Sequence, residues 1–201
     1  MKFRPWETAL LLLVASLLLF GAVAQASAEA LSDQFLRLHV IANSDSTEDQ
    51  ALKLLVRDEI LAHSQTFLSP ELSRTDCEAA LADRLPELKA LAQNVLQKNG
   101  SSLSVSASIT DAHFPTKHYA DFALPAGTYR ALRIVLGDGG GENWWCVVFP
   151  PLCFGAVSET TTAEQALAYG LDPQSTALIS GENEGYILKF KCLELWDSWV
   201  N

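Results

Sequence analysis

The sequence predicts an α+β domain in which two long N-terminal helices pack on a mostly antiparallel sheet, after an N-terminal signal peptide. Three observations support this fold class. One short alternating segment precedes two stretches of helical periodicity, which together end near residue 100. Most later segments alternate between apolar and polar residues and are separated by turn-forming residues. Strands that do not alternate regularly with helices favour an antiparallel sheet over repeated βαβ units.

The first 28 residues have the pattern of an export signal. Two cationic residues precede an apolar run from Ala9 to about Ala24, and alanine then alternates up to Ala28. Signal peptidases require small side chains one and three residues before the cut. A spanning helix needs about 20 apolar residues, so this run is slightly short. Residues 1–28 are therefore expected to be a cleaved signal peptide or, alternatively, a retained N-terminal anchor, and residues 29–201 a single exported domain.

The overall charge excludes several kinds of partner. The chain has 14 Lys and Arg against 24 Asp and Glu, a net charge of −10. An acidic surface repels nucleic acid and anionic lipid headgroups. We therefore expect no nucleic-acid binding, and membrane contact only through the N-terminal segment if it is uncleaved.

The first strand and helix of the domain are predicted from their periodicity. Residues 35–42 alternate and are expected to be a strand. The polar turn at residues 43–46 ends the strand, and its last serine, or the threonine after it, can cap a helix over residues 47–67. Asp49 and Lys53 are spaced to form an ion pair on that helix.

A second long helix is expected to follow. Thr75 begins a capping-box pattern that ends at Glu78. Pro86 should kink or restart the helix, because proline lacks the N–H that a helix interior requires. Asn99 and Gly100 are a typical C-terminal stop.

The remaining chain is expected to be mostly strands. The predicted strands cover residues 103–109, 118–124, 129–136, 144–149 and 187–195, with a short helix at residues 162–169. Five residues from Gly137 to Gly141 include four glycines. No Lys-Ser or Lys-Thr pair and no helix start follow them, so we interpret the cluster as a flexible hairpin loop and not as a phosphate-binding loop.

The cysteines indicate structure and not catalysis. Outside the cytosol thiols tend to oxidise, and Cys146 and Cys153 are seven residues apart with two prolines between them. They are the expected disulfide, although buried free thiols are the alternative. Cys77 and Cys192 complete the set of four, and no C-x-x-C pair suggests zinc. No local signature supports a catalytic thiol, and no G-x-S-x-G motif supports a catalytic serine.

Two polar or aromatic segments are candidates for function. His39, Asn43, Asp45 and Asp49 could gather at the start of the first helix, either as a metal site or as a capping network beside a half-buried histidine. The second interpretation requires no ligand and is preferred, so no catalytic, metal or cofactor-binding residue is expected. The adjacent Trp144 and Trp145 point to opposite faces of a strand, so one is expected in the core. The other contacts a partner or packs against a second layer.

Long stretches of the sequence resemble one known family, the stage II sporulation protein R family. The resemblance covers about residues 35–155 and is carried by the segments 35–46, 49–53, 56–58, 125–129 and 143–154, which include FLRLHVIANSDS, DQALK, VRD, PAGTY and NWWCVVFPPLCF. The glycine loop departs from the family pattern, because Gly140-Gly141-Glu142 has no lysine nearby.

The resemblance implies a signalling role in endospore formation. Members of the family are exported from the forespore into the space between the forespore and mother-cell membranes. There they activate a membrane-embedded aspartic protease of the mother cell, which leads to processing of the mother-cell sigma factor precursor. The resemblance therefore implies a non-enzymatic protein ligand without a cofactor.

The candidate partner-binding residues are those of the two dense polar and aromatic segments. They are Asn43, Asp45, Asp49, Trp144, Trp145 and Phe149. The alternative function is a secreted enzyme such as a cell-wall hydrolase, which would require acidic or histidine side chains that converge in a cleft. A membrane-anchored structural subunit is a third interpretation, and it would require the N-terminal segment to stay attached.

Overall fold

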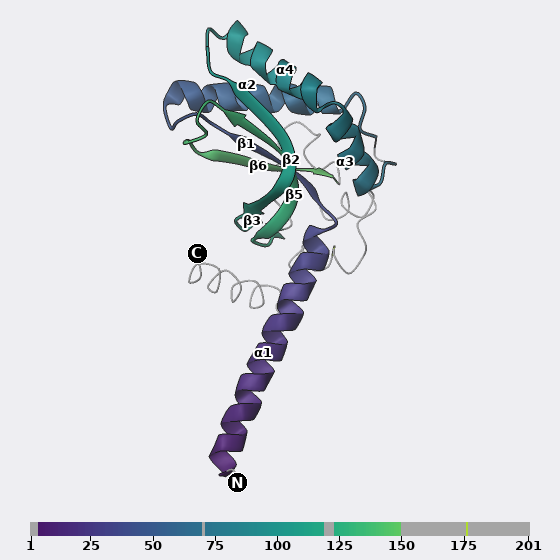
Figure 1. Ribbon diagram of the computed structural model, residues 1–201, viewed down its shortest axis with the longest axis vertical. Coiled ribbons are helices and arrows are strands. Elements are labelled where there is room, and N and C mark those ends of the chain that lie inside the picture. The colour runs from purple at the N-terminus through teal and green to yellow at the C-terminus, as the bar shows by residue number, and fades with distance from the viewer. Residues whose placement is uncertain (1–3, 70, 119–122, 150–175, 177–201) are drawn as a thin grey trace.

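The computed structural model describes residues 4–69, 71–118, 123–149 and 176. In this part of the chain a four-stranded sheet carries helices on one face, and a long N-terminal helix leaves from one end of the domain (Figure 1). The fold class is α+β, as predicted. The sheet is mixed, because two of its three strand pairings are antiparallel and one is parallel.

The sheet has the strand order β2-β5-β1-β6. The central strand β1 is parallel to β5 and antiparallel to β6, and β2 is antiparallel to β5. All six residues of β1 are buried, as expected for a strand with neighbours on both sides. The bounds of these strands are β1 (Leu36–Ile41), β2 (Val105–Phe114), β5 (Gly127–Leu136) and β6 (Asn143–Phe149).

Two expectations about the strands are wrong. The strand expected at residues 118–124 is replaced by a small ladder of β3 (Lys117–His118) and β4 (Ala123–Leu124), and β5 pairs with β2 and β1. The glycine loop is not a hairpin, because β5 and β6 lie on opposite sides of β1. The second error concerns the placement of the distant strand β1 between β5 and β6, which local alternation does not encode.

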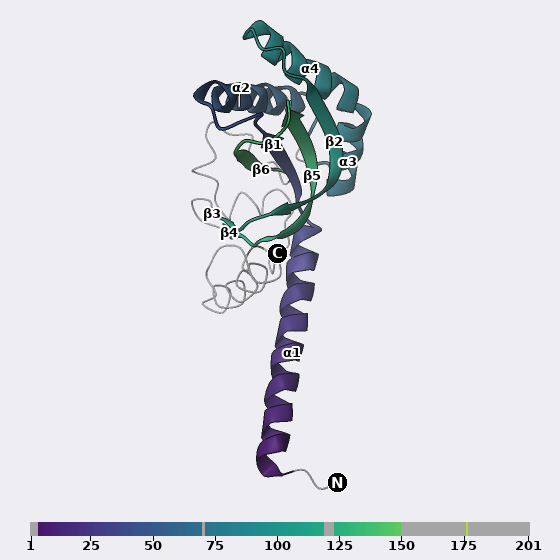
Figure 2. The same ribbon diagram turned by 60° about the vertical axis from the view of Figure 1, so that its left-hand side comes forward.

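Three helices follow β1 in the chain and lie on one face of the sheet (Figures 1 and 2). They are α2 (Thr47–Ser64), α3 (Arg74–Asp83) and α4 (Leu85–Lys98). The expected second long helix is therefore divided, and Pro86 lies in the first turn of α4, where the restart was predicted. Gly100, with a φ of +76°, follows the C-terminal end of α4, as expected for a helix stop.

Of the two predicted N-terminal caps, one is confirmed. The Ser46 side chain accepts a hydrogen bond from the backbone N–H of Asp49 (3.1 Å) and caps α2, as expected. The cap of α3 is Ser73, which accepts from the N–H of Asp76 (3.1 Å), and not Thr75. Ser73 and Thr75 are both good capping residues followed three positions later by an acidic residue, so the sequence pattern alone does not decide between them.

The hydrophobic core lies between the helices and the sheet. Val56 and Ile60 of α2, Leu81 of α3, and Leu88 and Ala92 of α4 are all buried there. They belong to the same cluster as the buried leucines and valine of β1. Removal of this apolar surface from water is the main contribution to the stability of the domain.

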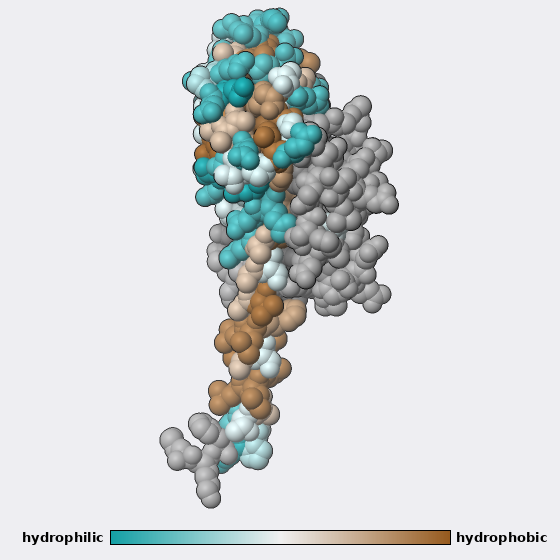
Figure 3. Space-filling model, turned by 90° about the vertical axis from the view of Figure 1, so that its right-hand side faces the viewer, coloured by the Kyte–Doolittle hydropathy of each residue, from teal (hydrophilic) through white to brown (hydrophobic). Residues whose placement is uncertain are grey.

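The N-terminal helix α1 (Pro5–Ser32) has two parts with different surroundings. Its large apolar side chains from Leu10 to Val23 are exposed (Figure 3), and by length and composition α1 is the one helix among the described residues that could cross a membrane. A signal sequence passes the same test, so α1 is compatible with the predicted signal peptide. Its last turns belong to the domain, since Ala28 is 9% exposed and Leu31 is 1% exposed.

Several expectations fall outside the described residues. They are the helix at residues 162–169, the strand at residues 187–195, and Cys153 and Cys192.

Candidate functional site

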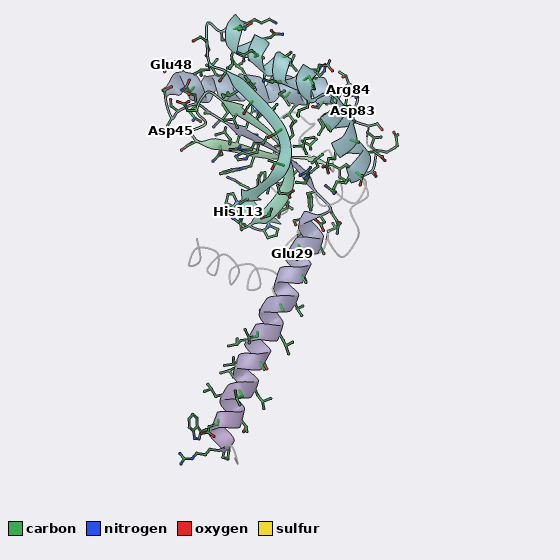
Figure 4. The ribbon with its side chains drawn as sticks, viewed as in Figure 1. Glu29, Asp45, Glu48, Asp83, Arg84 and His113 are labelled. Carbon is green, nitrogen blue, oxygen red and sulfur yellow. The ribbon has the colours of Figure 1, made fainter. Side chains whose placement is uncertain are left out.

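The candidate residues of the β1–α2 turn lie at the end of the sheet opposite α1. Figure 4 places Asp45 and Glu48 at that end, whereas Glu29 and His113 lie near the junction of α1 with the domain. The glycine loop reaches the same end, because Gly140 and Gly141 bond to the backbone of the turn. We call residues 43–49 and 137–142 together the distal pole.

The carboxylate of Asp49 is enclosed by hydrogen bonds from its own turn. Its Oδ2 atom accepts from Asn43 Nδ2 (2.8 Å) and from Ser44 Oγ (2.5 Å). The pKa of Asp49 is held below its ordinary value, chiefly by the Ser44 hydroxyl and then by the Asn43 amide. Asp49 therefore closes the turn at the start of α2.

Asn43 connects this turn to the glycine loop. Its Oδ1 atom accepts from the backbone N–H of Asp138 (3.1 Å), and its backbone carbonyl accepts from the N–H of Gly140 (3.0 Å). The carbonyl of Ala42 accepts from the N–H of Gly141 (3.0 Å). One asparagine thus joins two segments that are more than ninety residues apart in the chain.

The glycines of the loop are required by close packing. At Gly137, where φ is +57°, a Cβ atom would collide with the side chain of Asn43. At Gly141 a Cβ atom would collide with the backbone of Ser44. The predicted flexible loop is therefore a closely packed connection that crosses the end of β1.

Asp45 and Lys53 attach the start of β6 to the same network. Asp45 Oδ1 accepts from the backbone N–H of Glu142 (2.6 Å). Lys53 is only 4% exposed, and its ammonium donates to the carbonyl of Glu142 (3.0 Å) and to Gln50 Oε1. Burial lowers the pKa of Lys53, an effect that the nearby acidic residues Glu142 and Asp45 oppose.

The ion pair expected between Asp49 and Lys53 is not formed, because each side chain has other partners. The sequence showed only the four-residue spacing of the two charges. The contact of Lys53 with Glu142 spans 89 residues, and no local signal predicts it.

The polar side chains of the distal pole form a capping network at the start of α2. His39 bonds through Nε2 to Asn143 Oδ1 (2.8 Å), away from the partners of Asp45 and Asp49. Among the described residues, no group of three or more His, Cys, Asp or Glu side chains could hold a metal ion. A catalytic site here would have to bring together His39, Asp45 and Asp49. These side chains instead have separate hydrogen-bond partners.

The two tryptophans lie on opposite faces of the sheet, as predicted, since Trp144 pairs with Val40 and Trp145 with His39. The guanidinium of Arg57 lies over the Trp144 ring, 4.2 Å from its centroid. Trp145 stacks on His39 (6.0 Å between ring centroids), and the ammonium of Lys117 lies over it at 4.2 Å. Both rings are half-buried, so partner contact by one of them stays a prediction.

The face of the sheet that carries Trp145 contains a buried cation that the sequence pattern did not predict. Arg37 on β1 is fully buried, and its guanidinium lies over the rings of Phe114 (4.0 Å) and Tyr129 (4.8 Å). On the same face, burial holds the pKa of His39 below its ordinary value. The hydrogen bond to Asn143 opposes this, and the nearby arginines reinforce it.

The candidate residues do not form one patch. Asn43, Asp45 and Asp49 lie at the distal pole, and Trp144 and Trp145 begin β6 beside it. Phe149 pairs with Leu36 at the other end of β6, about 20 Å from the first residue of the strand at 3.3 Å per residue. A partner at the distal pole would therefore not reach Phe149 by a compact contact.

The cysteines have two different states. Cys77 is a buried free thiol, and burial, helped by Asp76, raises its pKa to about 11. Cys146 is disulfide-bonded. Because Cys153 lies outside the described residues, the pairing of Cys146 with Cys153 stays a prediction.

Comparisons with known proteins agree on one family. The family described as Stage II sporulation protein R matches residues 32–159. The Stage II sporulation protein R of Bacillus subtilis (strain 168) is 43% identical over 122 residues, which are 61% of this chain and 54% of that protein. The chain therefore matches about half the length of this relative. No solved structure matches the chain.

Proposed function

Because the chain belongs to the stage II sporulation protein R family, we propose that it is an exported, non-enzymatic signalling protein of endospore formation. In this proposal it activates a membrane-embedded aspartic protease of the mother cell, which then processes the mother-cell sigma factor precursor. The observation that carries the proposal is the family match over residues 32–159, which include β1, α2–α4 and the whole described sheet.

The N-terminal helix supports the location that this function requires. An exposed apolar helix at the N-terminus is what export across the cytoplasmic membrane needs, and α1 has that character. We propose that the domain acts in the space between the forespore and the mother cell. A retained α1 would keep the domain close to the membrane from which it was exported.

Activation by a ligand without catalysis requires differential binding. The protein must bind the active form of the protease more tightly than the inactive form, and so shift the population between them. The distal pole suits this role because its side chains already bond to one another. Binding there would cost little conformational entropy. Asp45 is exposed at this pole and is the most accessible of the candidate residues there.

The test is reconstitution in a host that does not sporulate. The membrane protease and its sigma factor precursor would be expressed together with this chain, either complete or without residues 1–28. We expect precursor cleavage only with the complete, exported chain, measured by immunoblot of the precursor and its product.

Two outcomes would contradict the proposal. Cleavage at the same rate with the unexported form would show that export is not needed. No cleavage, with all proteins shown to be folded and the complete chain exported, would favour the secreted-enzyme alternative, which an assay of cell-wall hydrolysis would then examine.

A further inference from the structure

Strand β2 is a long and regular edge of the sheet. It pairs with β5 over all ten residues from Val105 to Phe114, without a bulge or a shift of register. In the part of the chain that the structure describes, its other side pairs with no strand, and it lies at the margin of the sheet (Figure 2). The strand therefore presents backbone groups on its outer side.

The hydrogen bonds at the start of β2 show which residues point outward. In an antiparallel pair, successive residues direct their N–H and C=O groups alternately toward and away from the partner strand. The carbonyl of Ser104 accepts from the N–H of Gly137, so the even-numbered residues face β5. The N–H of Val105 points the other way and donates to Gln93 Oε1 (3.1 Å).

Gln93 of α4 occupies the first position of this outer edge. Its Nε2 atom donates to the carbonyl of Leu103 (2.8 Å), and its Oε1 atom accepts from Val105, so one side-chain amide pairs with the strand as a neighbouring strand would. By the same alternation, Ala107 and Ile109 direct their N–H and C=O groups outward. Those backbone groups have no hydrogen-bond partner among the described residues.

Beyond Gln93, the edge has few of the features by which proteins usually protect an exposed strand. Such strands are typically short, or contain proline, lysine or a bulge. β2 has ten residues, without proline, lysine or arginine, and it has no bulge. Its one acidic residue, Asp111, is 67% exposed in its side chain, because Arg130 forms its closer contact with Glu78 (2.7 Å, against 3.4 Å to Asp111).

We propose that an extended, positively charged segment of a partner protein adds to β2 as a further strand and pairs with the backbone from Ala107 to Asp111. Backbone pairing with an open edge is a common mode of peptide recognition. The sign of the partner follows from the charge of Asp111 and from the net charge of −10 of the whole chain. A second copy of this chain would carry the same charge and is therefore disfavoured.

The test is amide hydrogen exchange, followed by nuclear magnetic resonance, on the isotopically labelled full chain in a neutral detergent. The probe is a synthetic peptide in which lysine alternates with valine. We expect it to slow the exchange of the Ala107 and Ile109 amides by at least about tenfold, because they become hydrogen-bonded. The Ser106 and Ser108 amides, which already face β5, should not change.

Two matched peptides separate charge from backbone pairing. A peptide with glutamate in place of lysine should give no protection, and neither should a lysine peptide whose pairing amides are N-methylated. The proposal is overturned if the Ala107 and Ile109 amides are already slow in the free protein or are unaffected by the lysine peptide. It is also overturned if the glutamate or the N-methylated peptide protects them equally well.

Two variants complete the experiment. Ala107→Pro removes an N–H that does not bond to β5, so the strand should remain paired while peptide protection is lost. If that variant does not fold, Asp111→Lys takes its place. It should weaken binding of the lysine peptide by about fivefold, whereas Asp83→Lys on α3 should not. Unchanged binding by Asp111→Lys, or by a folded Ala107→Pro, would overturn the proposal.

Discussion

The distal pole and the outer edge of β2 lie on the margins of the same sheet, yet they differ in what they leave available to a partner. The distal pole is rich in polar side chains, and most of these bond to one another or to the glycine loop. The β2 edge alternates between small or apolar residues and polar ones, and the outward backbone groups of Ala107 and Ile109 have no hydrogen-bond partner among the described residues. A partner at the distal pole would therefore meet a rigid surface with few unbonded groups, whereas a partner at the β2 edge would meet backbone groups that are still free to form hydrogen bonds.

Substitutions in the two regions should therefore have different effects. Changes within the distal pole remove hydrogen bonds or create collisions, so they should lower the free energy of unfolding. Changes at the outward groups of β2 should leave folding nearly intact and alter binding only.

The largest effect is expected for Gly137→Ala. The new Cβ atom would collide with the Asn43 side chain at a positive φ, so the variant should lose about 3 kcal/mol of unfolding free energy. Gly100→Ala is the matched control, because it has a similar φ of +76° but no atom within 4 Å of the new Cβ. It should lose only about 1 kcal/mol. Urea denaturation of both variants measures the difference, and equal losses would show that packing against Asn43 is unimportant.

A smaller effect is expected for Asn43→Ala. The substitution removes the hydrogen bond to the charged Asp49 and the acceptor for the Asp138 N–H, at a cost of about 2 kcal/mol. Asn94→Ala, on the exposed side of α4, should change the unfolding free energy by less than about 0.5 kcal/mol. If Asn43→Ala were as stable as the control but failed to trigger precursor cleavage, Asn43 would be a contact residue and the comparison above would be wrong.

The parts of the fold that the sequence predicted are those determined by neighbouring residues. The cap at Ser46, the restart at Pro86, the stop at Gly100 and the opposite orientations of Trp144 and Trp145 all depend on interactions within a few residues. Steric and hydrogen-bonding preferences act at that range, so the pattern alone is sufficient.

The features that the sequence did not predict depend on contacts between distant segments. Because β1 lies between β5 and β6, the glycine loop must cross the end of β1. There it packs so closely against residues 43 and 44 that Cβ atoms at Gly137 and Gly141 would collide with them. Lys53 meets Glu142, and Gln93 meets Val105, through the same non-local arrangement. The candidate site was recognised in the sequence as a dense polar segment, but which of its groups are already bonded depends on this topology.

The smallest predicted effect concerns the pH dependence of stability and tests the hydrogen bonds to Asp49 directly. The folded state holds the pKa of Asp49 below the ordinary value of 3.8, chiefly through the Ser44 hydroxyl. The ionised carboxylate therefore stabilises the fold above that value, and this contribution is lost as the pH falls from 3.8 through the lower folded pKa. Asp49→Asn cannot ionise, so its unfolding free energy should change less over this acidic range than that of the unmodified chain, and Ser44→Ala should lie between the two. Denaturation at a series of acidic pH values measures the three slopes. Identical slopes would mean that the bonds of the distal pole do not favour the charged form of Asp49, and that the pole is less firmly closed than its geometry indicates.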